Sequence, residues 1–168
     1  MAETETKAAL VEMLDGLDGE RLRLAESWIR TLLRKSGASR PGASAGPLTD
    51  FLHIRRVSSE DGRAVFELDS APEVLNPYGF LAGPAVYAMV DYSMGAATAS
   101  TLAPNQTCAT VEIKMSYLSS VRGGTVRAET EVVKRGRQIV FLESKVRDDA
   151  GRLIATATGS FIVIGAGA

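Results

Sequence analysis

Apolar residues follow helical spacing at the start of the chain and strand spacing over most of the remainder. In residues 3 to 35, two sets of apolar residues each share one helical face: Leu10, Leu14 and Leu17, then Leu22, Ala25, Trp28, Ile29, Leu32 and Leu33. Asp18-Gly19 predicts a break between two helices, with Asp18 as the candidate N-cap of the second. The Gly-, Ser- and Pro-rich stretch 36–47 is typical of a linker. We therefore predict a helical appendage over 1–47 and a main domain over 48–168.

The main domain shows strand patterns on both sides of one long apolar segment. Two strands are predicted at 51–57 and 63–69, joined by the turn Glu60-Asp61-Gly62. A helix is predicted from Gly83-Pro84, because proline is favoured at the first helical position, to about Leu102. Four more strands follow at 107–118, 125–134, 137–147 and 152–163, with short joins that contain glycine.

This helix is apolar on nearly all sides, so it must be covered on most of them. Six strands around one such helix predict an α+β fold, in which a curved, six-stranded antiparallel sheet wraps around the helix. The small residues Gly95, Ala96, Ala97 and Ala99 are expected to let strands approach closely. A two-stranded ribbon, a buried helix and a four-stranded meander are the element order of the hot-dog fold.

Composition narrows the class of protein. The 168 residues suffice for one continuous core, and 45% hydrophobic and 23% charged residues are ordinary for a globular protein. A net charge of -1 favours neither a nucleic-acid partner nor a membrane surface. One cysteine, Cys108, allows no intramolecular disulfide, and no signal peptide or membrane span is recognised, so we expect a cytoplasmic protein. One His and one Cys argue against catalytic triads and zinc sites, and no metal or cofactor is expected.

One charged side chain, Asp91, interrupts the span from Val74 to Val111. An isolated carboxylate in apolar surroundings costs several kcal/mol unless it is compensated. Two interpretations stay open at this point: Asp91 lies on a solvated or interface face, or it lines a cleft as a general base or nucleophile. Gly83 lies at the helix start, where backbone N–H groups are unpaired and the dipole is positive, which suits an oxyanion hole. The alternative for Gly83 is a simple turn glycine.

The stretch from Asn76 to Ala97 resembles the PaaI-type thioesterases of the hot-dog superfamily. Their pattern is Asn-x-x-Gly-x-x-His-Gly-Gly, followed by Asp or Glu on the helix, and this chain supplies Asn76, Gly79, Gly83 and Asp91 in register. The downstream strands extend the resemblance over about 48 to 164. The chain departs from the pattern at two positions, with Ala82 in place of the His and Pro84 in place of the second Gly.

The resemblance implies an acyl-CoA thioesterase that releases a carboxylate and free CoA. It implies that Asp91 activates water or attacks the thioester, that Gly83 is the oxyanion donor, and that Asn76 holds the water or the carboxylate. Thr110 falls where some members orient the water with a hydroxyl, although it is equally compatible with an ordinary strand threonine. The family's site lies between subunits, so a homodimer or homotetramer is implied.

Substrate contacts are assigned to two further groups. The basic cluster Lys134, Arg135 and Arg137, together with Arg122, suits CoA phosphates, or is a solvated hairpin end. Tyr78, Phe80, Tyr87 and Met89 are candidates for an acyl pocket, or belong to the core.

Other functions are weighed beside hydrolysis. His53 is interpreted as structural or surface, and the absence of a histidine near Asp91 in the sequence argues against a dehydratase. Ala82 and Pro84 leave open a non-catalytic acyl- or CoA-binding protein, and a structural subunit whose partner supplies the chemistry is the third possibility.

Overall fold

The computed structural model describes residues 2–33 and 46–165. The chain divides into two compact units, Met1–Lys35 and Ser36–Ala168, which are described separately. Most of the predicted linker, 36–47, lies outside the described residues. The predicted domain boundary at residue 47 stays a prediction.

The first unit consists of two helices, α1 (Ala2–Asp15) and α2 (Gly19–Leu33). The Arg21 N–H donates to Asp18 Oδ1 at 2.9 Å, which satisfies one of the unpaired amides at the start of α2. The predicted break at Asp18-Gly19 and the cap at Asp18 are therefore confirmed. Within the described residues, no helix of either unit is long and apolar enough to cross a membrane.

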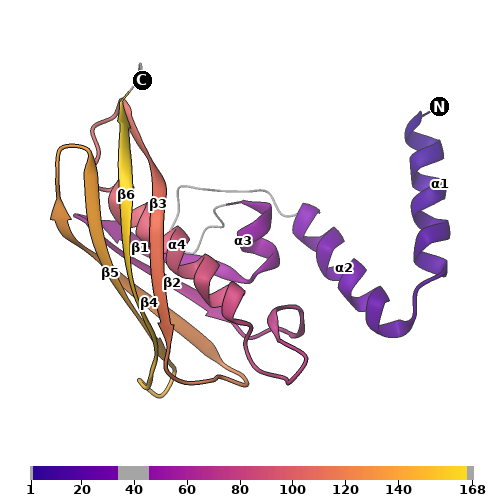
Figure 1. Cartoon of the computed structure of the whole chain (residues 1–168). Helices are drawn as coiled ribbons and strands as arrows, with labels where there is room; N and C mark the ends of the chain where they lie inside the picture. Colours follow the sequence, from indigo (N-terminus) through magenta and orange to yellow (C-terminus); the bar gives the residue numbers. More distant parts are fainter. Residues whose placement is uncertain (1, 34–45, 166–168) are drawn as a thin grey trace. The chain divides into compact units, whose positions relative to one another are not determined.

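The second unit is a six-stranded antiparallel sheet that curves around one helix, α4 (Gly83–Ala99), as Figure 1 shows. The strand order is β1-β2-β4-β5-β6-β3, so β1 and β3 form the two edges. The strands are β1 (Ile54–Glu60), β2 (Arg63–Asp69), β3 (Gln106–Tyr117), β4 (Thr125–Arg135), β5 (Ile139–Asp148) and β6 (Leu153–Gly165). Two short helices, α3 (Pro47–Phe51) and η1 (Pro72–Val74), complete the unit. The predicted α+β hot-dog fold is confirmed, but the predicted four-stranded meander is wrong, because β3 pairs with β6 and β4 pairs with β2.

The largest differences from the predicted boundaries, three residues each, are in the first strand and at the end of the central helix. The first strand was expected from Phe51, but Phe51 ends α3 and β1 begins at Ile54. Pro47 starts α3, since its fixed φ suits a first helical turn, and the Thr49 hydroxyl donates to the Gly46 carbonyl at 2.8 Å. The central helix was expected to reach Leu102 but ends at Ala99, where the Ser100 and Thr101 hydroxyls bond back to helix carbonyls.

The core lies between α4 and the inward face of the sheet. Met89, Val90 and Met94 of α4 are fully buried, and they pack with alternate inward residues of the strands. Gly159 of β6 is closely packed, because a Cβ there would lie 2.8 Å from Met94 Sδ and would force that side chain to shift. The close approach therefore occurs at Gly159 rather than at Gly95, where a Cβ would make only an ordinary contact with Phe161.

One side of α4 is not covered by the sheet, although the other sides are covered as expected. Residues spaced by three or four along this side are half-buried or exposed: Pro84, Tyr87, Ala88, Asp91, Tyr92, Gly95, Ala96 and Ala99. Apart from Asp91, this uncovered stripe carries no charge. An apolar helix face of this length favours burial against another surface.

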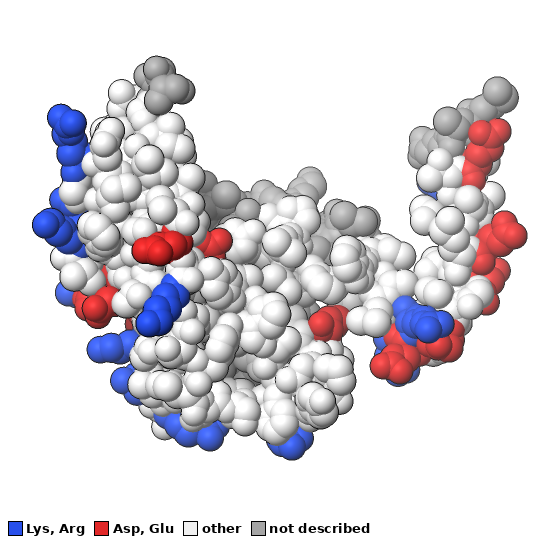
Figure 2. All heavy atoms as spheres, in the orientation of Figure 1, with Lys and Arg blue, Asp and Glu red and all other residues white. Residues whose placement is uncertain are grey.

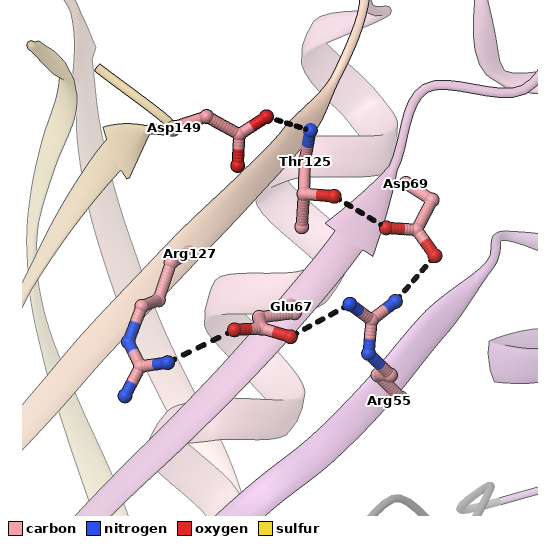
Figure 3. A network of polar contacts seen from close by, with 6 residues as sticks. All are labelled: Arg55, Glu67, Asp69, Thr125, Arg127 and Asp149. Carbon is pink, nitrogen blue, oxygen red and sulfur yellow. Dashed lines mark hydrogen bonds and ion pairs between the residues drawn. The ribbon is translucent and has the colours of Figure 1, made fainter. Parts of the chain in front are cut away.

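Charges on the outer face of the sheet are paired across β1, β2 and β4 (Figure 3). Glu67 accepts hydrogen bonds from Arg55 at 2.7 Å and from Arg127 at 2.9 Å. Arg55 also bonds Asp69, which in turn accepts the Thr125 hydroxyl at 2.7 Å. The network ties β1 to β4 through β2 on the face remote from α4.

Candidate active site

The edge strand β3 runs along α4 from its C-terminal half to its first residue. Thr110 contacts Asp91 and Tyr117 contacts Gly83, so the two ends of β3 reach two different parts of the helix. Between them, the Tyr87 hydroxyl donates to the Ile113 carbonyl at 3.4 Å. The uncovered stripe of α4 and the outer part of β3 therefore form one continuous surface.

Asp91 and Thr110 lie 19 residues apart in sequence, and the structure brings them together. The Thr110 hydroxyl donates to Asp91 Oδ1 at 2.8 Å. Asp91 is half-buried and follows Val90, which is wholly buried in the core. In Figure 2 the surface over α4 shows few charged atoms, in keeping with the charge-free sequence on both sides of Asp91. A carboxylate held by a hydroxyl at a largely apolar surface is suited to bind and activate a water molecule.

A β-bulge determines which side chains of β3 face the helix. The pairing of β3 with β6 shifts register between Thr110 and Glu112, so Val111 is the extra residue. Counting by twos from Thr110 would turn Lys114 toward α4 and Tyr117 away from it. Because of the bulge, Tyr117 instead joins Thr110 on the helix side.

Gly83 offers a backbone donor at the start of α4. Its N–H makes no hydrogen bond within residues 46–165. Pro84 carries no N–H, while the amides of Ala85 and Val86 both donate to the Ala82 carbonyl, at 3.1 and 3.3 Å. The Gly83 N–H is thus the one unpaired amide in the first turn, at the positive end of the helix dipole. This geometry suits a developing oxyanion.

The loop before α4 is held in place by its own backbone. The amides of Asn76, Leu81 and Ala82 donate to the carbonyls of Phe80, Val121 and Val74, at 2.7, 2.7 and 2.8 Å. Asn76 Oδ1 accepts the amides of Tyr78 and Phe80, at 2.9 and 3.2 Å. In this chain Asn76 therefore orders the loop, and none of its described hydrogen bonds reaches Asp91.

The aromatic candidates occupy different environments. Tyr78 is 80% exposed, and Tyr87 is 38% exposed beside β3. The Phe80 ring lies beneath the Arg122 guanidinium, 4.0 Å from it, next to the loop. Met89 is fully buried in the core, which agrees with the second of the two interpretations left open for it.

The basic cluster Lys134, Arg135 and Arg137 lies at the β4–β5 turn. The preceding part of β4 bonds the β1–β2 turn, and Gly62 of that turn donates to the Ser100 hydroxyl at 2.8 Å. Within one chain, the cluster is therefore nearer the C-terminal end of α4 than Gly83. Arg135 is folded back on its own turn, where it bonds the carbonyls of Gly136 and Arg137.

Two other polar regions lie apart from the Asp91 site. A hollow of about 420 Å³ lies over β2, β4 and β5, lined by the exposed charged side chains Arg63, Glu129, Glu131, Glu143 and Lys145 among others. It contains none of the predicted catalytic residues. His53 lies before β1, with its Nε2 3.7 Å from Glu73, in agreement with a structural role. Among the described residues no group of three or more His, Cys, Asp or Glu could hold a metal ion.

Comparison with known proteins agrees with this fold. A model of the thioesterase superfamily matches residues 78–155, which include the loop, α4 and β3. Over these residues the chain is similar to the thioesterase superfamily. Thioester hydrolysis is the enzyme class that these similarities support.

Individual relatives are similar over most of their length. The 1,4-dihydroxy-2-naphthoyl-CoA hydrolase of Listeria monocytogenes is 27% identical over 107 residues, covering 64% of this chain and 87% of the relative. A conserved Pseudomonas aeruginosa protein, PA5202, is 29% identical with a TM-score of 0.69, covering 76% of this chain and all of that one. The BH2602 protein of Bacillus halodurans, solved with CoA, is 27% identical with a TM-score of 0.74 and covers 94% and 99% of the two chains.

Proposed function

We propose that this thioesterase hydrolyses an acyl-CoA, with Asp91 as the catalytic carboxylate and the Gly83 N–H as the oxyanion donor. The hydrogen bond from Thr110 to Asp91 carries the proposal, because it fixes a carboxylate beside a hydroxyl on an otherwise uncharged helix face. The similarity to a CoA-bound structure and to an acyl-CoA hydrolase supports CoA as the thiol part of the substrate.

In this proposal, Asp91 accepts a proton from a water molecule that the Thr110 hydroxyl helps to orient. The water oxygen adds to the thioester carbon, and the negative charge that develops on the carbonyl oxygen is stabilised by the Gly83 N–H. Collapse of the tetrahedral adduct breaks the C–S bond. The thiol leaves with one proton, and the acyl group leaves as a carboxylic acid. Direct attack by Asp91 would give an acyl-Asp anhydride instead, which water then hydrolyses.

One chain alone does not provide this arrangement. Gly83 and Asp91 are eight residues apart on one helix, which places them about 12 Å apart along its axis. A carbonyl oxygen and the carbon attacked beside it need both groups within roughly 3 to 4 Å. We therefore infer that Asp91 acts with Gly83 of a second copy, so the site lies between two subunits.

The layout of β3 supports this pairing. β3 is an edge strand of 12 residues with one unpaired side, a feature that proteins normally cover. Antiparallel pairing of β3 with its counterpart, about a two-fold axis near Ile113 and Lys114, reverses the order of the strand ends. The Tyr117–Gly83 end of one copy would then meet the Thr110–Asp91 end of the other. Such a dimer also covers the uncovered stripe of α4; pairs of dimers would form a homotetramer.

Substrate contacts remain part of the proposal. Arg122, placed over Phe80 beside the loop, and the cluster Lys134, Arg135 and Arg137 are assigned to the CoA phosphates, with Tyr78, Phe80 and Tyr87 near the acyl group. Asn76 supports the donor by ordering the loop. We infer a cytoplasmic location, which the single, unpaired Cys108 supports.

The test combines a substrate panel with mixed subunits. Thiol release is measured with aryl- and fatty-acyl-CoAs for the wild type, Asp91→Asn and Gly83→Pro. The two variants are then unfolded together and refolded. A shared site predicts two nearly inactive variants whose 1:1 mixture recovers about one quarter of wild-type activity, because half the dimers are mixed and each has one intact site.

The outcomes separate the alternatives. Binding without turnover across the panel would favour a non-catalytic acyl-CoA-binding protein. Turnover by Asp91→Asn at the wild-type rate would exclude Asp91 as the catalytic carboxylate. No recovery on mixing, despite mixed dimers seen by mass spectrometry, would refute the shared site.

A further inference from the structure

Tyr117 makes the one side-chain hydrogen bond to the first residue of α4 among the described residues. Its hydroxyl donates to the Gly83 carbonyl at 2.9 Å, although the two residues are 34 positions apart. Its side chain also packs against Gly83: a Cβ built there would lie 3.4 to 3.6 Å from ring and hydroxyl atoms of Tyr117. Tyr117 therefore both bonds and covers the residue whose N–H is unpaired.

Side chains of the loop itself do not supply this support. Ala82, which precedes Gly83, offers only a methyl group. The side-chain oxygen of Asn76, Oδ1, already accepts hydrogen bonds from the amides of Tyr78 and Phe80. Backbone bonds hold the loop as far as the Ala82 carbonyl, which shares a peptide with the Gly83 N–H. Tyr117 adds a side-chain contact to the next peptide, through the Gly83 carbonyl.

We propose that Tyr117 is a positioning residue for the oxyanion donor: by bonding the Gly83 carbonyl and packing over Gly83, it restricts rotation about the two backbone bonds that link this carbonyl to the Gly83 N–H, and so limits how the donor can turn. The inference rests on the proposed function and names a residue that the sequence motif does not contain. A donor that must meet a developing charge gains from having few alternative orientations, because reorganisation during the reaction is then small. Tyr117 thus acts through Gly83 and does not itself take part in bond making.

The state of the phenol suits this role. Partial burial and the neighbouring Tyr87 hydroxyl both raise the pKa of Tyr117, so its hydroxyl stays protonated and able to donate in the alkaline range. Tyr117 is also 52% exposed in the single chain and lies on the edge strand. In the proposed dimer, the Tyr117 ring and Gly83 of one copy lie together beside Asp91 of the second copy. There the ring would form an aromatic wall beside the thioester.

The experiment is a double-mutant cycle between Tyr117→Phe and Gly83→Pro, with kcat and KM measured for one acyl-CoA. Tyr117→Phe removes only the hydroxyl, and we expect kcat to fall about threefold to tenfold with KM nearly unchanged. In the Gly83→Pro background, where the N–H is absent, the same change should lower kcat little further. Tyr92→Phe is the matched control. The Tyr92 side chain packs against the core, and its hydroxyl makes no hydrogen bond within residues 46–165.

Each result has a distinct meaning. A wild-type kcat for Tyr117→Phe would overturn the positioning role while leaving the thioesterase intact. An equal loss in both backgrounds would show that Tyr117 acts independently of the Gly83 N–H, which also overturns it. A wild-type protein that releases no thiol from any substrate would remove the proposed function, and the role of Tyr117 with it.

Discussion

Replacing Gly83 by proline removes one hydrogen-bond donor with little disturbance of the fold. Proline is favoured at a first helical position, and the Gly83 N–H makes no hydrogen bond that the change would break. Ala82 has φ -68° and ψ 132°, the extended conformation that a residue before proline prefers. Residue 83 also precedes Pro84, which disfavours a helical residue with a Cβ, so we expect the free energy of unfolding to fall by about 1 to 2 kcal/mol, with a similar loss in Gly83→Ala.

The effect on catalysis should be far larger. No neighbouring amide replaces the lost donor, since Pro84 has no N–H and the amides of Ala85 and Val86 bond the Ala82 carbonyl. Loss of one oxyanion donor typically lowers kcat by about 10²- to 10³-fold, or about 2.7 to 4 kcal/mol in the transition state. Because this interaction strengthens only as charge develops, KM should change little.

The assay is steady-state thiol release, accompanied by thermal unfolding of each variant. Gly83→Ala is the matched control: it keeps the N–H, and its methyl group would lie 3.4 to 3.6 Å from the Tyr117 ring, an ordinary contact. We expect Gly83→Ala to retain most of its activity. A folded Gly83→Pro enzyme with wild-type kcat would refute the oxyanion assignment. Equal losses in both variants would mean that shape at Gly83, rather than its donor, limits the rate.

Four further predictions concern the residues around this donor and the remote face of the sheet. Asp91→Asn preserves the acceptor of the Thr110 hydrogen bond but loses the base, so kcat should fall about 10²- to 10⁴-fold with an unchanged unfolding midpoint. Thr110→Val should lower kcat about tenfold, while Thr110→Ser, which keeps the hydroxyl, should stay near wild type in the same assay. Arg122→Ala should raise KM severalfold for an acyl-CoA but not for the acyl-pantetheine that lacks the nucleotide phosphates; equal shifts for both would argue against phosphate contact. Glu67→Gln should cost about 1 kcal/mol in urea unfolding, because two partly exposed arginines lose their charged partner, and kcat should not change.

The sheet and its central helix could be predicted from sequence because their signals are local. Alternation at Val126, Ala128 and Thr130 marks one buried face of β4, and these residues are indeed buried. Short glycine-containing joins predicted the neighbours β1–β2, β4–β5 and β5–β6, but not the pairing of β3 with β6. The five residues of α3 are too few to show a helical period, and apolar Phe51 therefore extended the predicted first strand.

The sequence could not show which side of the central helix the sheet leaves uncovered. Apolar residues give the same spacing whether they face the chain's own sheet or another surface. Asp91 and Gly83 were recognised from one charge in an apolar span and one glycine before a proline. Thr110, the partner of Asp91, was suggested by the family resemblance, whereas Tyr117, the partner of Gly83, was not. Tyr117 was missed for a physical reason: strict alternation from Thr110 turns it away from the helix, and only the bulge at Val111 reverses that.

The bulge fixes the number of residues needed between the two contacts of β3 with α4. Thr110 lies before the extra residue and Tyr117 lies after it, so both side chains face the helix only with the bulge between them. An insertion or deletion of one residue between them would leave one contact in place and turn the other outward, although every side chain of the site would still be present. This protein should therefore tolerate substitutions along β3 better than insertions or deletions between Thr110 and Tyr117.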